Sequence, residues 1–309
     1  MPQQRQAMNE LPIGVQDFES VRTNDMVYVD KTDIIYRMIR NCRWNFISRP
    51  RLFGKSLLVS TLESLFSHGT EMFRGLAIEK LWTEKTYRVM HLDFSYISCG
   101  TAEEFDAKSR ELFMGELGRL RFPRETIESC GRRRDLARMA WEAFSELELD
   151  AIVLLIDEYD TPLNRNLRNR AVFEAIQHKI RRFYDAVREN QGSFRFVFIT
   201  GVSRFNMAQT FGEDSYLEDL SLKPLYATLL GFTEDEIRHC FGEHLKAATA
   251  SIFRISRNEV TDTQIDQVMD ELRTRYDGYC FDCRARSYMT VINLLHNLTY
   301  IKNYKNSVI

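Results

Sequence analysis

Three adjacent residues, Gly54, Lys55 and Ser56, have the types and the spacing that bind the phosphates of a nucleotide. They follow an apolar strand pattern around Phe46 and open an apolar helix pattern. A helix that begins directly after such a turn points backbone N–H groups and the positive end of its dipole at one small volume. Lys55 would add a point charge to the β- and γ-phosphates, and Ser56 is the residue type that places a hydroxyl on Mg²⁺. The turn therefore predicts a phosphate and magnesium site.

The loop before the lysine matches only half of the usual signature G-x-x-x-x-G-K-[ST]. Arg49 stands where the first glycine is expected, and Pro50 has no backbone N–H to donate. The donors nearest to the phosphates would come from the later part of the loop, and Arg51 would help to neutralise phosphate charge. A Gly-Lys-Ser turn by itself is also compatible with an ordinary surface turn. The predicted nucleotide-binding residues are Arg51, Leu52, Phe53, Gly54, Lys55, Ser56 and Leu57.

Two carboxylates, Asp157 and Glu158, directly follow the apolar run from Ala151 to Ile156. A continuous apolar run with β-branched residues is typical of a strand that is buried on both faces in a parallel sheet. Ligands of open α/β sheets bind at the carboxyl ends of such strands, where Asp157 would hold Mg²⁺ and Glu158 would polarise the attacking water. The alternative is that the pair caps the next helix, for which Asp160-Thr161-Pro162 is a suitable start.

A third apolar run, from Phe194 to Ile199, ends in Thr200, and Arg204 follows shortly after it. In nucleotide hydrolases with a strand between the phosphate-loop strand and the metal strand, a polar residue at this place can sense the γ-phosphate, and a nearby arginine can neutralise transition-state charge. The candidate catalytic residues are therefore Glu158, Lys55, Thr200 and Arg204. The alternatives are a strand-end hydroxyl that caps a turn for Thr200 and an ordinary solvated side chain for Arg204.

Seven sequence blocks spread over nearly the whole chain together resemble one known family. They are Leu11–Phe18, Val27–Thr32, Ser48–Ser56, His91–Ser95, Leu155–Asp160, Thr200–Phe205 and Tyr276–Tyr279. The family is the predicted AAA-ATPase-like group of bacterial and archaeal P-loop proteins, which are often fused to a C-terminal PD-(D/E)XK-type nuclease domain. Its own phosphate loop is similar to Ser-Arg-Pro-Arg-x-Phe-Gly-Lys-Ser, so the resemblance accounts for Arg49. It implies ATP as the nucleotide, with Mg²⁺.

The chain departs from the family pattern in two places. Relatives usually continue into the nuclease domain, whereas this chain ends at Ile309 without a Pro-Asp followed at suitable spacing by Asp/Glu-x-Lys. We therefore expect no nuclease activity from it. The second departure is Cys280-Phe-Asp-Cys283, where relatives tend to carry an aromatic or basic residue. Two free thiols are expected here, with a structural zinc site as the alternative, for which a second ligand pair is missing.

The composition is that of an ordinary soluble globular protein, with 44% apolar and 28% charged residues. A net charge of −2 gives no general attraction to nucleic acid, and the basic clusters at Arg132–Arg134 and from Arg165 to Arg188 are compatible with solvated helix faces. No apolar stretch approaches the roughly 20 residues of a membrane helix, and the start is too polar for a signal peptide. Scattered cysteines fit a reducing compartment, so we expect a cytoplasmic protein with no membrane partner.

Strand patterns alternate with helix patterns up to about residue 225, which implies right-handed crossovers and a mainly parallel sheet. After a disordered segment 1–10, we predict a three-layer α/β P-loop NTPase fold of the ASCE/AAA-like class over 11–225. A smaller helical domain over 226–309 follows. It opens with a capping box at Thr233–Glu236 and has a last helix at Val291–Leu298. By analogy, this domain would cover the nucleotide or hold a protein partner.

Three functions are compatible with these patterns. The first is an Mg²⁺-dependent ATPase, and the second is a nucleotide-gated interaction module with little hydrolysis. The third is a nucleic-acid-associated ATPase that partners a nuclease, which the overall charge supports only weakly. In each case residues around Tyr28–Thr32 would border the base, with a plain structural helix as the alternative. The oligomeric state stays open.

Overall fold

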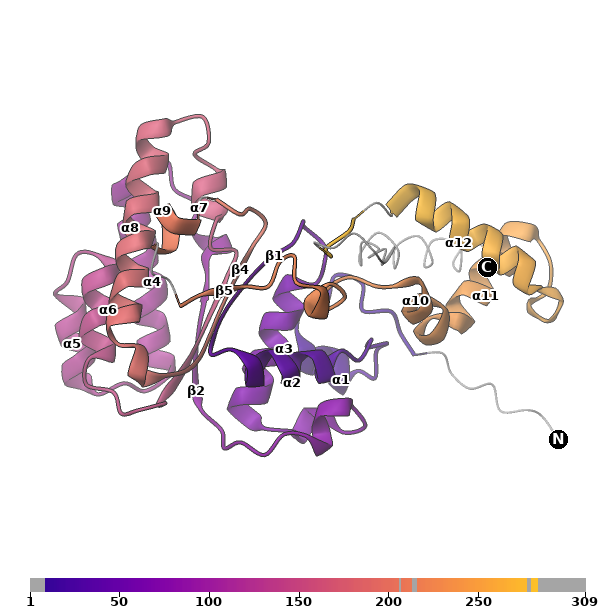
Figure 1. The fold of residues 1–309 in the computed structure, drawn as a ribbon, viewed down its shortest axis with the longest axis horizontal. Coiled ribbons are helices and arrows are strands. Elements are labelled where there is room, and N and C mark those ends of the chain that lie inside the picture. The colour runs from indigo at the N-terminus through magenta and orange to yellow at the C-terminus, as the bar shows by residue number, and fades with distance from the viewer. Residues whose placement is uncertain (1–8, 206, 213–215, 277–278, 283–309) are drawn as a thin grey trace.

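The computed structural model describes residues 9–205, 207–212, 216–276 and 279–282, and its centre is a parallel sheet of five strands (Figure 1). The strands lie in the order β2-β3-β4-β1-β5, and every neighbouring pair is parallel. β4 therefore lies between β1, which leads to the Gly-Lys-Ser turn, and β3, which ends in Asp157. The bounds are β1 Trp44–Ser48, β2 Arg88–Asp93, β3 Ile152–Asp157, β4 Phe194–Gly201 and β5 Glu218–Asp219.

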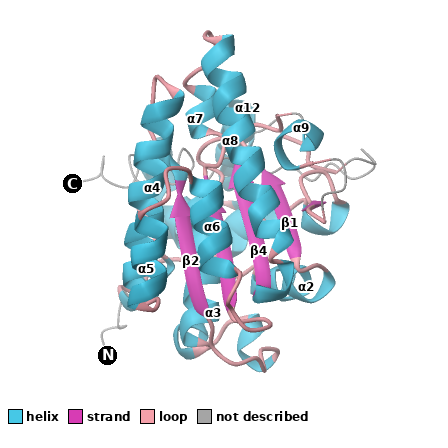
Figure 2. Ribbon diagram, turned by 90° about the vertical axis from the view of Figure 1, so that its left-hand side faces the viewer, coloured by secondary structure: helices cyan, strands magenta, loops and turns pink. Residues whose placement is uncertain are grey.

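Helices cover both faces of the sheet and complete the three predicted layers (Figures 1 and 2). Successive residues of β3 point to opposite faces, so that Leu154 belongs to one hydrophobic core and Leu155 to the other. Both faces are buried, which is why the strand is apolar throughout. The α/β prediction is confirmed. One face carries α2 Thr32–Asn41 and α3 Lys55–His68, and the other carries α4 Ala102–Arg119, α5 Arg124–Gly131, α6 Leu136–Phe144 and α8 Arg170–Glu189.

The helices near the C-terminal end of the described chain have a hydrophobic core of their own, which includes Phe241 and Leu272. Leu11 and Ile13 from the N-terminal segment pack against it. The predicted capping box is present, since Thr233 and Glu236 each accept a hydrogen bond from the other's backbone N–H. This core supports a helical second domain, while its boundary at residue 226 stays a prediction. The helices are α10 Glu234–Cys240, α11 Gly242–Phe253 and α12 Asp262–Tyr276.

Three short helices complete the α-helices of the described chain, namely α1 Phe18–Thr23, α7 Thr161–Asn164 and α9 Met207–Phe211. The predicted helix at Val291–Leu298 and Cys283 of the alternative zinc pair lie outside the described residues, as does most of the predicted disordered segment 1–10. Among the described helices, none has the length and apolar character that crossing a membrane requires.

The edge of the sheet at β2 is covered by side chains of α4. Glu116 accepts a hydrogen bond from the backbone N–H of His91 at 2.8 Å, and Arg119 donates to the carbonyl of Val89 at 2.6 Å. These bonds satisfy backbone groups that no further strand pairs with, and so protect the edge. On its other side β2 pairs with β3, which places Asp93 opposite Asp157.

Buried side chains of the turn after β3 join the ends of β3 and β4. The carboxylate of Asp160 is fully buried and accepts hydrogen bonds from the backbone N–H groups of Val202 at 3.2 Å and Ser203 at 2.6 Å. The hydroxyl of Tyr159 donates to the carbonyl of Ser203 at 3.0 Å. A Cβ atom on Gly201 would lie 2.4 Å from Oδ1 of Asp160. Glycine is required at this position because the carboxylate fills the space that a side chain would need.

We expect Gly201→Ala to lower the free energy of unfolding by about 1–3 kcal/mol, because the added methyl group displaces the buried carboxylate of Asp160. Gly115→Ala is the matched control: no atom lies within 4 Å of its new Cβ. Since Gly115 is inside α4, alanine should stabilise the control by about 0.5–1 kcal/mol. Urea denaturation followed by circular dichroism measures both changes. Equal stability of Gly201→Ala and the wild type would contradict the packing described for Asp160.

Candidate functional site

The Gly-Lys-Ser turn connects β1 to α3 through a loop that curls around the side chain of Lys55. Leu52 and Gly54 adopt left-handed backbone conformations, with φ angles of 68° and 89°, which turn the chain before α3 begins. The ammonium of Lys55 donates to the carbonyls of Arg49 and Pro50 at 3.3 Å each. The N–H groups in the first turn of α3 have no partner within the helix. The loop and the helix start therefore have the shape and polarity of an anion site.

This loop forms one wall of a cavity of about 460 Å³. Of the seven predicted nucleotide-binding residues, Arg51, Leu52, Gly54, Lys55, Ser56 and Leu57 line it. The exception is Phe53, which is 1% exposed and packs its ring against Tyr279 and Phe281 at centroid distances of 5.0 and 5.5 Å. The remaining wall residues come from the N-terminal segment, the end of β2 and the turn after β3: Pro12, Gly14, Val15, Gln16, Asp93, Ser95, Glu158, Thr161, Asn164 and Arg165.

Ser56 and Asp157, the two predicted magnesium ligands, meet at the carboxyl ends of β1 and β3. The Ser56 hydroxyl donates to Oδ2 of Asp157 at 2.6 Å. Burial raises the pKa of Asp157 to about 6, and the charges of Glu158 and Asp93 add to this rise, while the hydrogen bond from Ser56 opposes it. A hydroxyl and a carboxylate beside further negative charge are the oxygen ligands that Mg²⁺ prefers. The residues present therefore fit a bound Mg²⁺.

Glu158 lines the cavity and is held there by an ion pair with Lys55. The distance from Oε1 of Glu158 to Nζ of Lys55 is 3.1 Å, and the lysine side chain is only 3% exposed. The backbone of Glu158 has a φ angle of 49°. Such a left-handed conformation costs a non-glycine residue roughly 1–3 kcal/mol and is concentrated at functional sites. The predicted catalytic base and the phosphate-binding lysine are thus in direct contact.

The structure does not bring Thr200 or Arg204 to the cavity wall. Thr200 is fully buried at the end of β4, and its hydroxyl donates to the carbonyl of Ile47 on β1 at 2.9 Å. This hydrogen bond joins the ends of two neighbouring strands, so it is a structural contact, as in the alternative interpretation of Thr200 as a strand-end hydroxyl. Arg204 pairs with Asp219 on β5, with 2.5 Å between Nη2 and Oδ2. Because β5 lies at the sheet edge farthest from β2, this ion pair directs Arg204 away from the end of β3.

Arg49, which replaces the first glycine of the signature, has a structural role that the sequence pattern does not indicate. Its side chain is 1% exposed and donates to the carbonyls of Ser221 and Tyr226 at 2.7 and 3.2 Å. The guanidinium also lies 3.9 Å from the ring centroid of Phe281. Burial lowers the pKa of Arg49 to about 9. Arg49 therefore ties the phosphate loop to the chain that follows β5 and to the chain that follows α12.

A smaller, mainly apolar pocket of about 70 Å³ adjoins the cavity and shares Pro12, Val15, Gly54 and Leu57 with it. An apolar pocket beside a phosphate site suits a nucleobase. Two of its walls come from segments that lie far apart in the sequence, the chain around the start of α2 and the chain before α10. Its further walls include Tyr28, Val29, Lys31, Phe53, Leu229 and Leu230.

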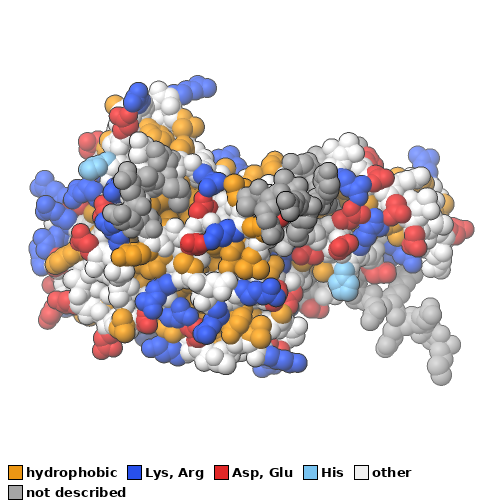
Figure 3. Space-filling view, viewed as in Figure 1, with side chains coloured by type: hydrophobic (Ala, Val, Ile, Leu, Met, Phe, Trp, Pro, Cys, Tyr) orange, Lys and Arg blue, Asp and Glu red, His pale blue; other side chains and the backbone are white. Residues whose placement is uncertain are grey.

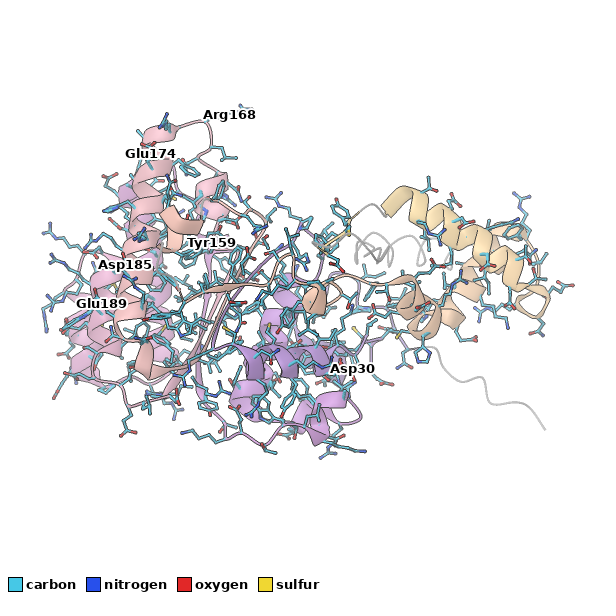
Figure 4. The ribbon with its side chains drawn as sticks, viewed as in Figure 1. Asp30, Tyr159, Arg168, Glu174, Asp185 and Glu189 are labelled. Carbon is cyan, nitrogen blue, oxygen red and sulfur yellow. The ribbon has the colours of Figure 1, made fainter. Side chains whose placement is uncertain are left out.

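Lys31 links this smaller pocket to the helical part of the chain. Asp30, labelled in Figure 4, accepts a hydrogen bond from the backbone N–H of Thr32 at 2.9 Å and so holds the start of α2 beside Lys31. Nζ of Lys31 lies 2.9 Å from Oε2 of Glu236 and also donates to the carbonyl of Thr228. Burial lowers the pKa of Lys31, and the charge of Glu236 opposes this shift. The carboxylate that caps α10 therefore also holds a wall of the pocket.

Comparison with known proteins identifies the family. A family model described as Predicted AAA-ATPase matches residues 12–211, more than half of the chain. A relative from Azotobacter chroococcum mcd 1, described as "Uncharacterized protein in vnfD 5'region", is 30% identical over 272 residues. This match covers 87% of the chain and 48% of the relative, so the chain spans about half of the relative's length. No solved structure matches. The chain therefore belongs to the predicted AAA-ATPase family.

Proposed function

We propose that this protein binds ATP with Mg²⁺ in the cavity of about 460 Å³ and hydrolyses it to ADP and phosphate. The observation that carries the proposal is the pair of contacts between Ser56 and Asp157 and between Lys55 and Glu158. These contacts collect a hydroxyl, two carboxylates and an ammonium at the start of one helix. The family supports the same class of ligand.

Each residue of the site has a distinct role in this proposal. The loop N–H groups and Lys55 would bind the phosphates, with Arg51 offsetting further negative charge. Ser56 and Asp157 would hold Mg²⁺, which when bound neutralises phosphate charge. Glu158 would orient a water molecule and accept its proton while the water oxygen bonds to the γ-phosphorus and the bond to the β–γ bridging oxygen breaks.

The ion pair between Lys55 and Glu158 gives the site a simple order of events. In the structure the carboxylate of Glu158 is held by the ammonium of Lys55 at 3.1 Å. A triphosphate attracts the same ammonium, because its oxygens carry more charge than one carboxylate. When Lys55 turns to the phosphates, Glu158 is released to bind water. The catalytic base would therefore become active only when the triphosphate is present.

A nucleotide-gated interaction module is the second candidate, and specific contacts favour it. The helical part reaches the smaller pocket through Glu236 and Lys31, and the chain after α12 reaches the loop through Tyr279 and Phe53. A ligand that moves either wall would change these contacts. On this candidate the free energy of nucleotide binding would serve to hold or release a protein partner.

A role on nucleic acid has weaker support. Basic side chains gather over the helical layer at the left of Figure 3, but acidic side chains lie among them. On α8, Arg170 pairs with Glu174, and Arg181 pairs with Asp185. Figure 4 labels Glu174 toward one end of this helix, and Asp185 and Glu189 toward the other. Paired charges give little of the positive potential that phosphate backbones require.

Hydrolysis is tested by Glu158→Gln and Lys55→Ala. We expect Glu158→Gln to lower kcat by about 10²–10⁴-fold, because the amide cannot accept a proton, with the Kd for MgATP unchanged within about threefold. Lys55→Ala removes the phosphate-binding charge and should weaken MgATP binding by more than about tenfold. Phosphate release and isothermal titration calorimetry measure the two quantities.

Glu189→Gln is the matched control for the change at Glu158, since it makes the same replacement at an exposed residue at the end of α8. It should behave as the wild type in both assays. A Glu158→Gln protein that releases phosphate at the wild-type rate would remove Glu158 from the proposed mechanism.

The base pocket is tested by Tyr28→Ala and Lys31→Ala. Both side chains form walls of the smaller pocket. Truncation should widen it and bring the ratio of the Kd values for GTP and ATP closer to one. Tyr216→Ala is the control because Tyr216 is 57% exposed and lines neither pocket. An unchanged ratio and unchanged affinity in both variants would exclude this pocket as the base site.

The second candidate predicts that nucleotide changes the accessibility of the chain near Tyr226, the predicted boundary between the two parts of the chain. Limited proteolysis with and without MgATP, followed by mass spectrometry of the fragments, measures this accessibility. We expect cleavage near this position to slow when MgATP binds. Identical cleavage patterns at saturating MgATP would argue against a nucleotide-gated module.

A further inference from the structure

The positively charged residues on the cavity wall come from two separate segments of the chain. Among the described residues that line the cavity, the cations are Arg51, Lys55 and Arg165, and the anions are Asp93 and Glu158. Two of the cations belong to the phosphate loop and the start of α3. The third, Arg165, directly follows α7, the short helix that comes after the turn containing Glu158. A positive charge therefore faces the cavity from a wall that the phosphate loop does not form.

The backbone that carries Arg165 is fixed by its two neighbours. Asn164 donates to Oδ2 of Asp160 at 2.8 Å. Asn166 is buried and donates to the carbonyls of Cys99 and Pro162 at 2.9 and 2.8 Å. The end of α7 is thus attached both to the turn after β3 and to the chain that follows β2. Arg165 itself is exposed, and within the described part of the chain it forms no ion pair with a carboxylate.

Two other arginines near the ends of the strands, Arg49 and Arg204, are already engaged elsewhere. Arg49 is buried against the carbonyls of Ser221 and Tyr226. Arg204 is paired with Asp219 on β5. Neither of them lines the cavity. Of the three arginines Arg49, Arg165 and Arg204, only Arg165 lines the cavity.

We propose that Arg165 is the cation that contacts the terminal phosphate of the bound triphosphate and stabilises the charge that develops on it during hydrolysis. This assignment rests on the proposed function. Glu158 would act on the water next to the γ-phosphate, and Arg165 lines the same cavity at the end of the short helix that follows Glu158, so we place Arg165 on the γ side of the nucleotide. An arginine that neutralises this charge contributes about 10³–10⁵-fold to the rate in phosphoryl-transfer enzymes.

A contact between Arg165 and the terminal phosphate would affect nucleotide binding as well as the rate of hydrolysis. A residue that contacts only the terminal phosphate discriminates a triphosphate from a diphosphate. Arg165 should therefore tighten the binding of ATPγS, a slowly hydrolysed triphosphate, and leave the binding of ADP unchanged. The ratio of these two affinities is measurable even if turnover is slow.

The experiment compares Arg165→Ala, Arg165→Lys and Arg168→Ala, with the Kd for ATPγS, the Kd for ADP and phosphate release measured on each. Arg168 is the matched control, an arginine on the same connection that does not line the cavity and points away from the sheet (Figure 4). Because Arg165 is exposed, its replacement should leave thermal stability unchanged. Arg165→Lys keeps the charge but loses the planar fork of donors, so it should recover part of the effect.

We expect Arg165→Ala to weaken ATPγS binding at least about fivefold with ADP binding unchanged, and to lower the rate of phosphate release about 100-fold or more. Arg168→Ala should match the wild type. If Arg165→Ala keeps the wild-type affinity ratio and rate while the wild type binds and hydrolyses MgATP, the assignment of Arg165 is wrong and the proposed function stands. If the wild type does not bind MgATP at all, the proposed function fails and this assignment fails with it.

Discussion

The ion pair between Lys55 and Glu158 is the contact on which the organisation of the site depends. The charge of a lysine whose side chain is only 3% exposed needs a partner, because an unpaired buried charge costs several kcal/mol. Here the partner is the carboxylate of Glu158, which directly follows β3 and has a strained, left-handed backbone conformation. The pair can form only if β1 and β3 end at the same edge of the sheet. The parallel strand order satisfies that condition and also brings Ser56 to Asp157.

Segments from the C-terminal half of the described chain contact both the phosphate loop and the smaller pocket. Arg49 takes the place of a glycine in the loop and reaches residues beyond β5 and after α12. Lys31 reaches the first turn of α10. Both are buried cations with partners far away in the sequence: Arg49 joins the loop to Ser221 and Tyr226, and Lys31 joins a wall of the smaller pocket to Glu236. This arrangement makes the phosphate loop a point where the two parts of the protein can influence each other.

The strands and the main polar residues of the site could be predicted because they depend on local patterns. An apolar run followed by Gly-Lys-Ser, and another followed by Asp157 and Glu158, indicate strand ends without knowledge of their neighbours. The directions of individual side chains could not be predicted in this way. Thr200 turns toward Ile47 because β4 lies next to β1, and Arg204 turns toward Asp219 because β5 lies beyond β1.

The same limit applies to residues whose roles come entirely from long-range packing. Asp160 looks like a helix cap in the sequence, yet its carboxylate holds the loop after β4. Arg165 looks like one of many solvated arginines, yet it lines the cavity. A sequence pattern shows which residues are near each other along the chain, whereas these contacts join segments about 40 residues or more apart, or depend on how a turn is oriented.

The central claim is that the cavity between the phosphate loop and the ends of β2 and β3 hydrolyses ATP. The most direct measurement is phosphate release by the wild-type protein over a range of ATP concentrations, in Mg²⁺ and again in excess EDTA. The account predicts release that saturates with ATP and is lost when the metal is chelated. Phosphate release no faster than the uncatalysed background, in a protein shown to bind MgATP, would contradict it.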